Sequence, residues 1–115
     1  MLLTFKNQKL TIGQLISGKL RENLLSENEM YVTGLINDWV SGKKQFELKT
    51  SGSTGQPKII SLSREVLEYS AKTSLEYLDP NHQFASSLLC INPQYIGGMM
   101  VVIRALVGNL DLSVG

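Results

Sequence analysis

The segment 50–58 constrains the fold more than any other part of the chain, because it joins two strand-like runs through a loop of small residues. It reads Thr-Ser-Gly-Ser-Thr-Gly-Gln-Pro-Lys. Before it, Phe46, Leu48 and Thr50 alternate with charged residues, which is the period of a half-buried strand. After it comes a second strand-like run with Ile60 and Leu62 on one face. The sequence therefore predicts two strands joined by this loop.

The residue types of this loop are suited to hold a phosphate group. Glycines let successive backbone N–H groups turn into one concavity, hydroxyl groups add donors, and a lysine adds a point charge. The candidate ligands are Thr50, Ser51, Gly52, Ser53, Thr54, Gly55 and Lys58. The loop is not a Walker A loop, because Gln56, Pro57 and a strand follow Gly55 where that motif requires a lysine and a helix. An ordinary surface turn is the alternative that composition leaves open.

Composition narrows the class of protein. The chain of 115 residues has 43% hydrophobic and 18% charged residues, as expected for one small globular domain or a piece of a larger one. A net charge of +1 gives no reason to expect nucleic acid as a partner. The residues from Ile96 to Gly108 are apolar but too few to span a bilayer. The first residues lack a signal-peptide pattern, so we expect a cytoplasmic protein.

Residues of potential chemical interest outside the loop are few. The single cysteine, Cys90, lies in an apolar run and is expected to be a buried structural thiol. The single histidine, His82, lies in a polar turn and is expected at the surface. No spacing of histidine, cysteine or acidic residues is typical of a metal site.

Capping and periodicity predict the remaining elements. Capping boxes at Thr11 and Ser26 start helices, the first extending to Leu20. Ser63 caps a third helix. Its buried side is expected to comprise Leu67, Ala71, Leu75 and Leu78, with Glu68 and Lys72 paired on the exposed side.

A second pattern follows in the last third of the chain. The apolar run 85–91 predicts a buried strand, 99–107 a helix that opens at Gly97 and Gly98, and 110–114 a further strand. A strand, helix and strand of this length form a βαβ unit with a parallel strand pair. The fold class is therefore α/β.

The string Ser-Gly-Ser-Thr-Gly-x-Pro-Lys at 51–58 closely resembles the phosphate-binding loop of the AMP-forming adenylating enzymes, the acyl-CoA synthetase and ligase superfamily. The order of elements from Phe46 to Val114 is also similar to the start of their large domain. The resemblance implies an incomplete N-terminal portion of that domain, with lead-in helices in 1–45 and the phosphate-loop strands and first βαβ unit in 46–115. The family's later motifs are absent, so no catalytic residue is assigned and the chain alone is expected to be inactive.

Within the superfamily, the string Asn-Pro-Gln-Tyr-Ile-Gly-Gly-Met-Met at 92–100, with Arg104, looks most like o-succinylbenzoate–CoA ligase, a family of menaquinone biosynthesis. That resemblance implies ATP and coenzyme A as co-substrates, Mg²⁺ as cofactor, and a small carboxylic acid as substrate. It also implies a candidate acyl-substrate pocket at Tyr95, Gly97 and Gly98. Tight packing at the two glycines, and a packed tyrosine at a strand end, are the alternatives.

Two departures from the family pattern concern the loop exit and the acyl site. Ile59 follows the loop lysine where many relatives have glycine or alanine, and Ile96 follows Tyr95 where many have histidine. A ligase for another acid, and a non-catalytic phosphate-binding module, remain alternative functions. The sequence does not decide the oligomeric state.

Overall fold

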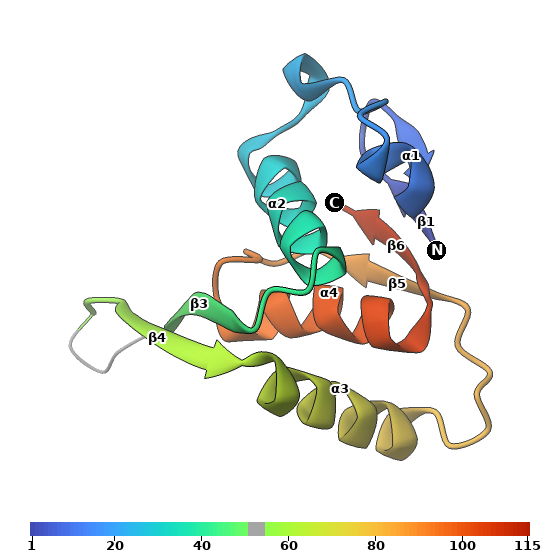
Figure 1. The fold of residues 1–115 in the computed structure, drawn as a ribbon. Coiled ribbons are helices and arrows are strands. Elements are labelled where there is room, and N and C mark those ends of the chain that lie inside the picture. The colour runs from blue at the N-terminus through green and yellow to red at the C-terminus, as the bar shows by residue number, and fades with distance from the viewer. Residues whose placement is uncertain (51–54) are drawn as a thin grey trace.

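The computed structural model describes residues 1–50 and 55–115, which form a small sheet, a separate hairpin and the helices around them (Figure 1). The sheet has four strands in the order β2-β1-β6-β5, and the hairpin is β3-β4. The strands are β1 Leu2–Thr4, β2 Lys9–Thr11, β3 Gln45–Thr50, β4 Lys58–Ser63, β5 Ser86–Leu89 and β6 Asp111–Val114. The helices are α1 Ile12–Ile16, the 3-10 turn Glu22–Leu24, α2 Glu27–Val40, α3 Arg64–Leu78 and α4 Ile96–Gly108.

The predicted βαβ unit is confirmed. β5 and β6 pair in parallel, with Leu89 opposite Val114, and α4 connects them. β6 pairs on its other side with β1, also in parallel, with Leu3 opposite Leu112. The N-terminal segment thus shares a sheet with the end of the chain.

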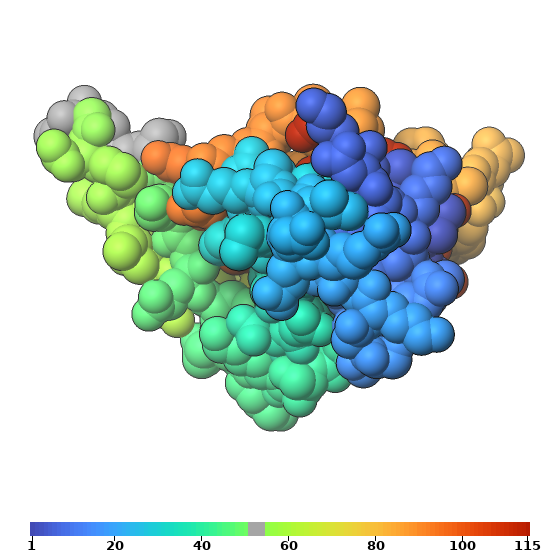
Figure 2. Space-filling model, turned by 90° about the horizontal axis from the view of Figure 1, so that it is seen from above, coloured from blue at the N-terminus to red at the C-terminus, as the bar shows by residue number. Residues whose placement is uncertain are grey.

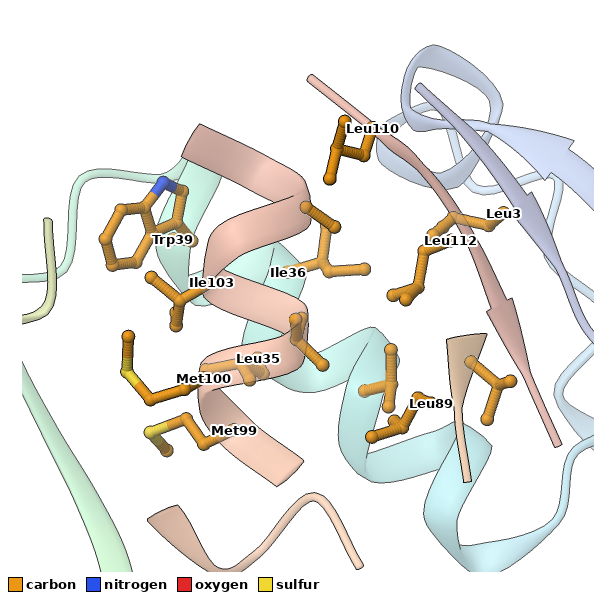
Figure 3. Packing of buried hydrophobic residues seen from close by; sticks show 14 of the residues in the cluster. Leu3, Leu35, Ile36, Trp39, Leu89, Met99, Met100, Ile103, Leu110 and Leu112 are labelled. Carbon is orange, nitrogen blue, oxygen red and sulfur yellow. The ribbon is translucent and has the colours of Figure 1, made fainter. Parts of the chain in front are cut away.

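The core lies where α2 and α4 meet the sheet. Figure 3 shows Ile36 of α2 on the side of α4 that faces Leu112 and Leu89 of the strands. Trp39 and Ile103 lie on the other side of α4, and all five belong to one buried cluster. Ile36, Ile103 and Leu112 have no exposed surface. α3 packs against α4 from the other side, as Figure 1 shows, so that α4 lies in the middle of the fold. None of the helices in the described part of the chain has the length and apolarity needed to cross a membrane.

The first helix is shorter than predicted, since it was expected to extend to Leu20. The capping box of Thr11 and Gln14 is present, but the helix ends at Ile16, which is exposed. Gly18 follows with φ +79°, a left-handed conformation that breaks the helix. The strand β2 before this helix was not predicted, because three residues are too few to show a period.

The expectation of a fully buried strand at 85–91 and of a buried Cys90 is wrong. β5 is the edge strand of the sheet, and the helices cover only the face that carries Leu89. On the opposite face Leu88 is 61% exposed, and Cys90 just after the strand is exposed as well. Composition predicts whether a residue is apolar, but not whether both faces of its strand are covered.

The third helix also differs in detail from its prediction. Ser63 caps it as expected, accepting from the Val66 N–H at 3.2 Å. Leu67 and Ala71 are buried, but Leu78 in the last turn is 56% exposed. The described residues contain no Glu68–Lys72 ion pair, because Glu68 accepts from Arg64 Nε at 2.9 Å instead.

Glu29 ties the second helix to the N-terminal strand segment. Its carboxylate accepts from the backbone N–H of Ser26 and from that of Lys6, both at 2.9 Å, while the side chain is only 4% exposed. Burial by itself raises the pKa of Glu29, but these hydrogen bonds outweigh burial, so the pKa is lowered from its ordinary value of 4.5.

Glu29 therefore predicts a dependence of stability on pH. A carboxyl group whose pKa is lower in the folded state stabilises the fold above its unfolded pKa, and this stabilisation is lost as pH falls through the folded pKa. Glu29→Gln should cost about 1 kcal/mol in the free energy of unfolding at pH 7 and flatten the loss of stability below about pH 5. Urea unfolding followed by circular dichroism at several pH values tests this. Glu27→Gln, an exposed change in the same helical turn, is the control for the loss of one negative charge from this helix.

Candidate phosphate-binding site

The register of the hairpin places two predicted phosphate ligands opposite each other. Thr50, the last residue of β3, pairs with Lys58, the first residue of β4. Because side chains alternate along a strand, both lie on the face that carries the Leu48–Ile60 pair. The hydroxyl of Thr50 and the ammonium of Lys58 thus flank the base of the connecting loop.

The hairpin is fixed at its other end. Phe46 and Leu48 are each 2% exposed, and the ring of Phe46 lies 5.5 Å from that of Trp39. Arg64 lies over the Trp39 ring at 4.0 Å and donates to the Trp39 carbonyl oxygen at 2.6 Å. Figure 2 shows the described part of β4 next to the loop, drawn in light green, projecting beyond the body of the molecule. The site thus lies at the tip of a β-ribbon whose base is packed into the fold.

Three of the predicted ligands lie in the described part of the chain. Thr50 is half-buried, whereas Gly55 and Lys58 are exposed. Gly55 has φ +80°, a left-handed conformation that favours glycine. The other predicted ligands lie outside the described residues; they are Ser51, Gly52, Ser53 and Thr54.

A groove runs along the hairpin, mainly beside residues of the face opposite to that of Thr50 and Lys58. A hollow of about 390 Å³ lies between α2 and the hairpin, and a smaller one of about 210 Å³ continues from it past Ile59 and Gln94. Both hollows are lined by Tyr31 and Glu47. Burial, with a contribution from the negative charge of Asp38, raises the pKa of Tyr31. Its phenol carries a proton at neutral pH even at the ordinary pKa, so it can donate a hydrogen bond. Ile59, the departure noted at the loop exit, is 68% exposed at the edge of this groove.

The candidate acyl-pocket residues lie next to the hairpin, at the start of α4. Tyr95 is half-buried and is the N-cap residue of the helix, without a side-chain capping bond. The Lys49 N–H of β3 donates to the Gln94 carbonyl oxygen at 2.9 Å, and Lys49 forms an isolated parallel bridge with Tyr95. The structure therefore brings two separately predicted segments together, a proximity that no pattern in the sequence indicates.

The two glycines of this segment differ in their surroundings. A Cβ atom on Gly98 would lie 2.2 Å from the Asn92 carbonyl oxygen, so tight packing against the preceding turn requires glycine there. A Cβ atom on Gly97 would be 3.5 Å from the side chain of Ile91, an ordinary contact, and Gly97 is exposed. The packing interpretation thus holds for Gly98, while Gly97 borders solvent.

The described residues offer cationic and hydroxyl groups but no cage for a metal ion. In residues 1–50 and 55–115 no three histidine, cysteine or acidic side chains come together as ligands. Mg²⁺ is commonly held by substrate phosphates and water with few protein ligands. The donor set at the hairpin suits a phosphate chain that brings its own magnesium.

Comparison with known proteins supports the resemblance at the level of the fold. The chain is similar to a crystal structure of an "acyl-CoA synthetase (AMP-forming)/AMP-acid ligase II-like protein" from Dyadobacter fermentans, with a TM-score of 0.70 and 28% sequence identity. The match covers 91% of this chain and 28% of that protein. The chain has the fold of part of an adenylate-forming ligase domain. No protein-family model and no curated protein sequence matches the chain.

Proposed function

We propose that this chain is the phosphate-binding part of an ATP-dependent, AMP-forming acid–CoA ligase. The observation that carries the proposal is the Thr50–Lys58 pair at the tip of an anchored hairpin, within a fold similar to an AMP-forming acyl-CoA synthetase. In such a reaction a carboxylate attacks ATP to give an acyl-adenylate and pyrophosphate, and the thiolate of coenzyme A then displaces AMP.

Each group at the hairpin would contribute to the first step by binding charge. The leaving pyrophosphate gains negative charge as the bond to AMP breaks, and fixed donors stabilise that charge most in the transition state. Lys58 would pair with phosphate oxygens, and Thr50 would donate from its hydroxyl. Residues 51–55 would supply backbone N–H groups. Bound Mg²⁺ would neutralise part of the phosphate charge.

For the acid, we propose o-succinylbenzoate, which would place the enzyme in menaquinone biosynthesis. The support is the string 92–100 with Arg104, which resembles that branch of the superfamily. Tyr95 and Gly97 would border the acyl group. Because the chain spans only 28% of the length of the similar structure, most of an acid pocket would come from other sequence.

The experiment compares this chain with a polypeptide that also contains the rest of a ligase fold. We expect the chain of 115 residues to bind Mg²⁺·tripolyphosphate in calorimetry but to show no ATP–pyrophosphate exchange. The longer polypeptide should exchange pyrophosphate only when its acid is present, with o-succinylbenzoate preferred over fatty, aryl and amino acids. Binding without exchange in every form would support the non-catalytic module, and exchange with another acid would overturn the choice of substrate.

A further inference from the structure

The turn 92–95 holds the phosphate hairpin by backbone contacts close to its tip. The Lys49 N–H donates to the Gln94 carbonyl oxygen at 2.9 Å, and Lys49 forms a parallel bridge with Tyr95. Lys49 directly precedes Thr50, the last paired residue of β3. A displacement of the Gln94 carbonyl would therefore be transmitted to the site within one residue.

Asn92 sets the shape of this turn. Its side-chain oxygen Oδ1 accepts from the Gln94 N–H at 2.9 Å, and its carbonyl oxygen accepts from the Tyr95 N–H at 3.3 Å. Such a local bond from an asparagine side chain is a common way to define a turn. Pro93 between them is fully buried and has a fixed φ angle. Together these contacts orient the peptide group that presents the Gln94 carbonyl.

Gly98 holds the turn against α4. A Cβ atom at this position would lie 2.2 Å from the Asn92 carbonyl oxygen and 2.8 Å from Pro93 Cα. Both are backbone atoms, which cannot rotate away as the end of a side chain can. Any larger residue must push the turn and the helix apart, and the turn is the segment that contacts Lys49.

We propose that Asn92 and Gly98 are positioning residues for the phosphate site, acting through the hydrogen bond from Lys49 to Gln94. They contact neither Thr50 nor Lys58 in the pairing of the hairpin; they fix the strand end on which that pair stands. The proposal rests on the proposed function, because only that function gives the Thr50–Lys58 pair the role of binding phosphate. It adds that the start of α4 sets the geometry of the hairpin.

The first test measures the link itself, through hydrogen exchange of the Lys49 amide by NMR. Gly98→Ala and Asn92→Ala should accelerate this exchange by about tenfold relative to the amides of β3 that bond to β4. Asn92→Asp keeps an oxygen acceptor at the same position and should restore protection. Gly97→Ala is the matched control, because a methyl group fits there, and should leave Lys49 exchange unchanged.

The second test measures the consequence, through calorimetric binding of Mg²⁺·tripolyphosphate. Asn92→Ala should bind about fivefold more weakly, because the Thr50–Lys58 pair is misplaced, and Asn92→Asp should recover the affinity. Lys58→Ala should lose affinity while Lys49 exchange stays as in the wild type. This result would distinguish Lys58, which binds the phosphate, from the residues that position it. If Gly98→Ala does not fold, Asn92→Ala and Asn92→Asp still test whether the turn positions the phosphate site.

The outcomes that overturn the proposal differ from those that overturn the function. Equal Lys49 exchange and equal affinity in wild type and Asn92→Ala would exclude the positioning role. A wild-type chain that binds no tripolyphosphate would refute the phosphate site, while the exchange rates would still show whether Asn92 holds β3. Accelerated exchange in Asn92→Ala with unchanged affinity would overturn the positioning of the phosphate pair.

Discussion

Replacing Lys58 with alanine is expected to lower the affinity for Mg²⁺·tripolyphosphate by about tenfold, since a charged donor to phosphate is lost from an exposed position. Thr50 and the backbone groups of the loop would remain, so binding should weaken and not disappear. Calorimetry at fixed ionic strength measures the effect, because an exposed charge is screened by salt. In a longer polypeptide with exchange activity, the same change should slow ATP–pyrophosphate exchange.

Two further variants make this prediction specific to the site. Lys72→Ala removes an exposed lysine of α3. It changes the net charge by the same amount as Lys58→Ala, so it controls for a general electrostatic effect. Lys58→Arg keeps the charge and should retain part of the affinity. Equal affinities for the wild type, Lys58→Ala and Lys72→Ala would remove the main chemical support for a phosphate site at the hairpin.

Replacing Leu112 with alanine is expected to have the largest effect on stability. Leu112 has no exposed surface and lies on the inner-sheet strand β6, where it pairs with Leu3 of β1 and Ser87 of β5. Truncation would leave a cavity between three strands and the helices, at a cost of about 2–5 kcal/mol. In a domain of marginal stability this is a large part of the total.

A matched leucine on the open face provides the control. Leu88 of β5 lies on the edge strand and is 61% exposed, so Leu88→Ala should cost less than about 1 kcal/mol. Thermal unfolding of both variants measures the difference. If Leu112→Ala alone lost its cooperative transition, that result would also agree with the prediction. Similar losses in the two variants would mean that the sheet is not packed on one face as described.

The features that sequence predicted well are those encoded within a few residues. The capping boxes at Thr11 and Ser26 are both present with their reciprocal bonds. The alternation of Phe46 and Leu48 correctly predicted the buried face of β3. The short strand-helix-strand spacing predicted the parallel pair of β5 and β6. In each case the signal and the structure lie on the same length of chain.

The predictions that were wrong concern partners and coverage. Glu68 had a suitable lysine four residues ahead, but Arg64 is already held by the Trp39 ring and carbonyl and lies closer. Cys90 lies in an apolar run and Leu78 on the apolar side of α3, but both are exposed because no other element covers them. Which side of a strand or helix is covered depends on packing between distant segments, and a local pattern does not record it.

The sequence by itself determined the hairpin, the helix starts and the chemistry of the loop, because capping, alternation and residue type act over a few neighbouring residues. Only the tertiary structure decided that β1 joins β6, that one face of the sheet is open, and that the turn 92–95 meets Lys49. These contacts form between segments far apart in the chain, and they depend on which faces the helices bury. The proposed site depends on both, since its ligands are local and the strand that carries them is held from a distance.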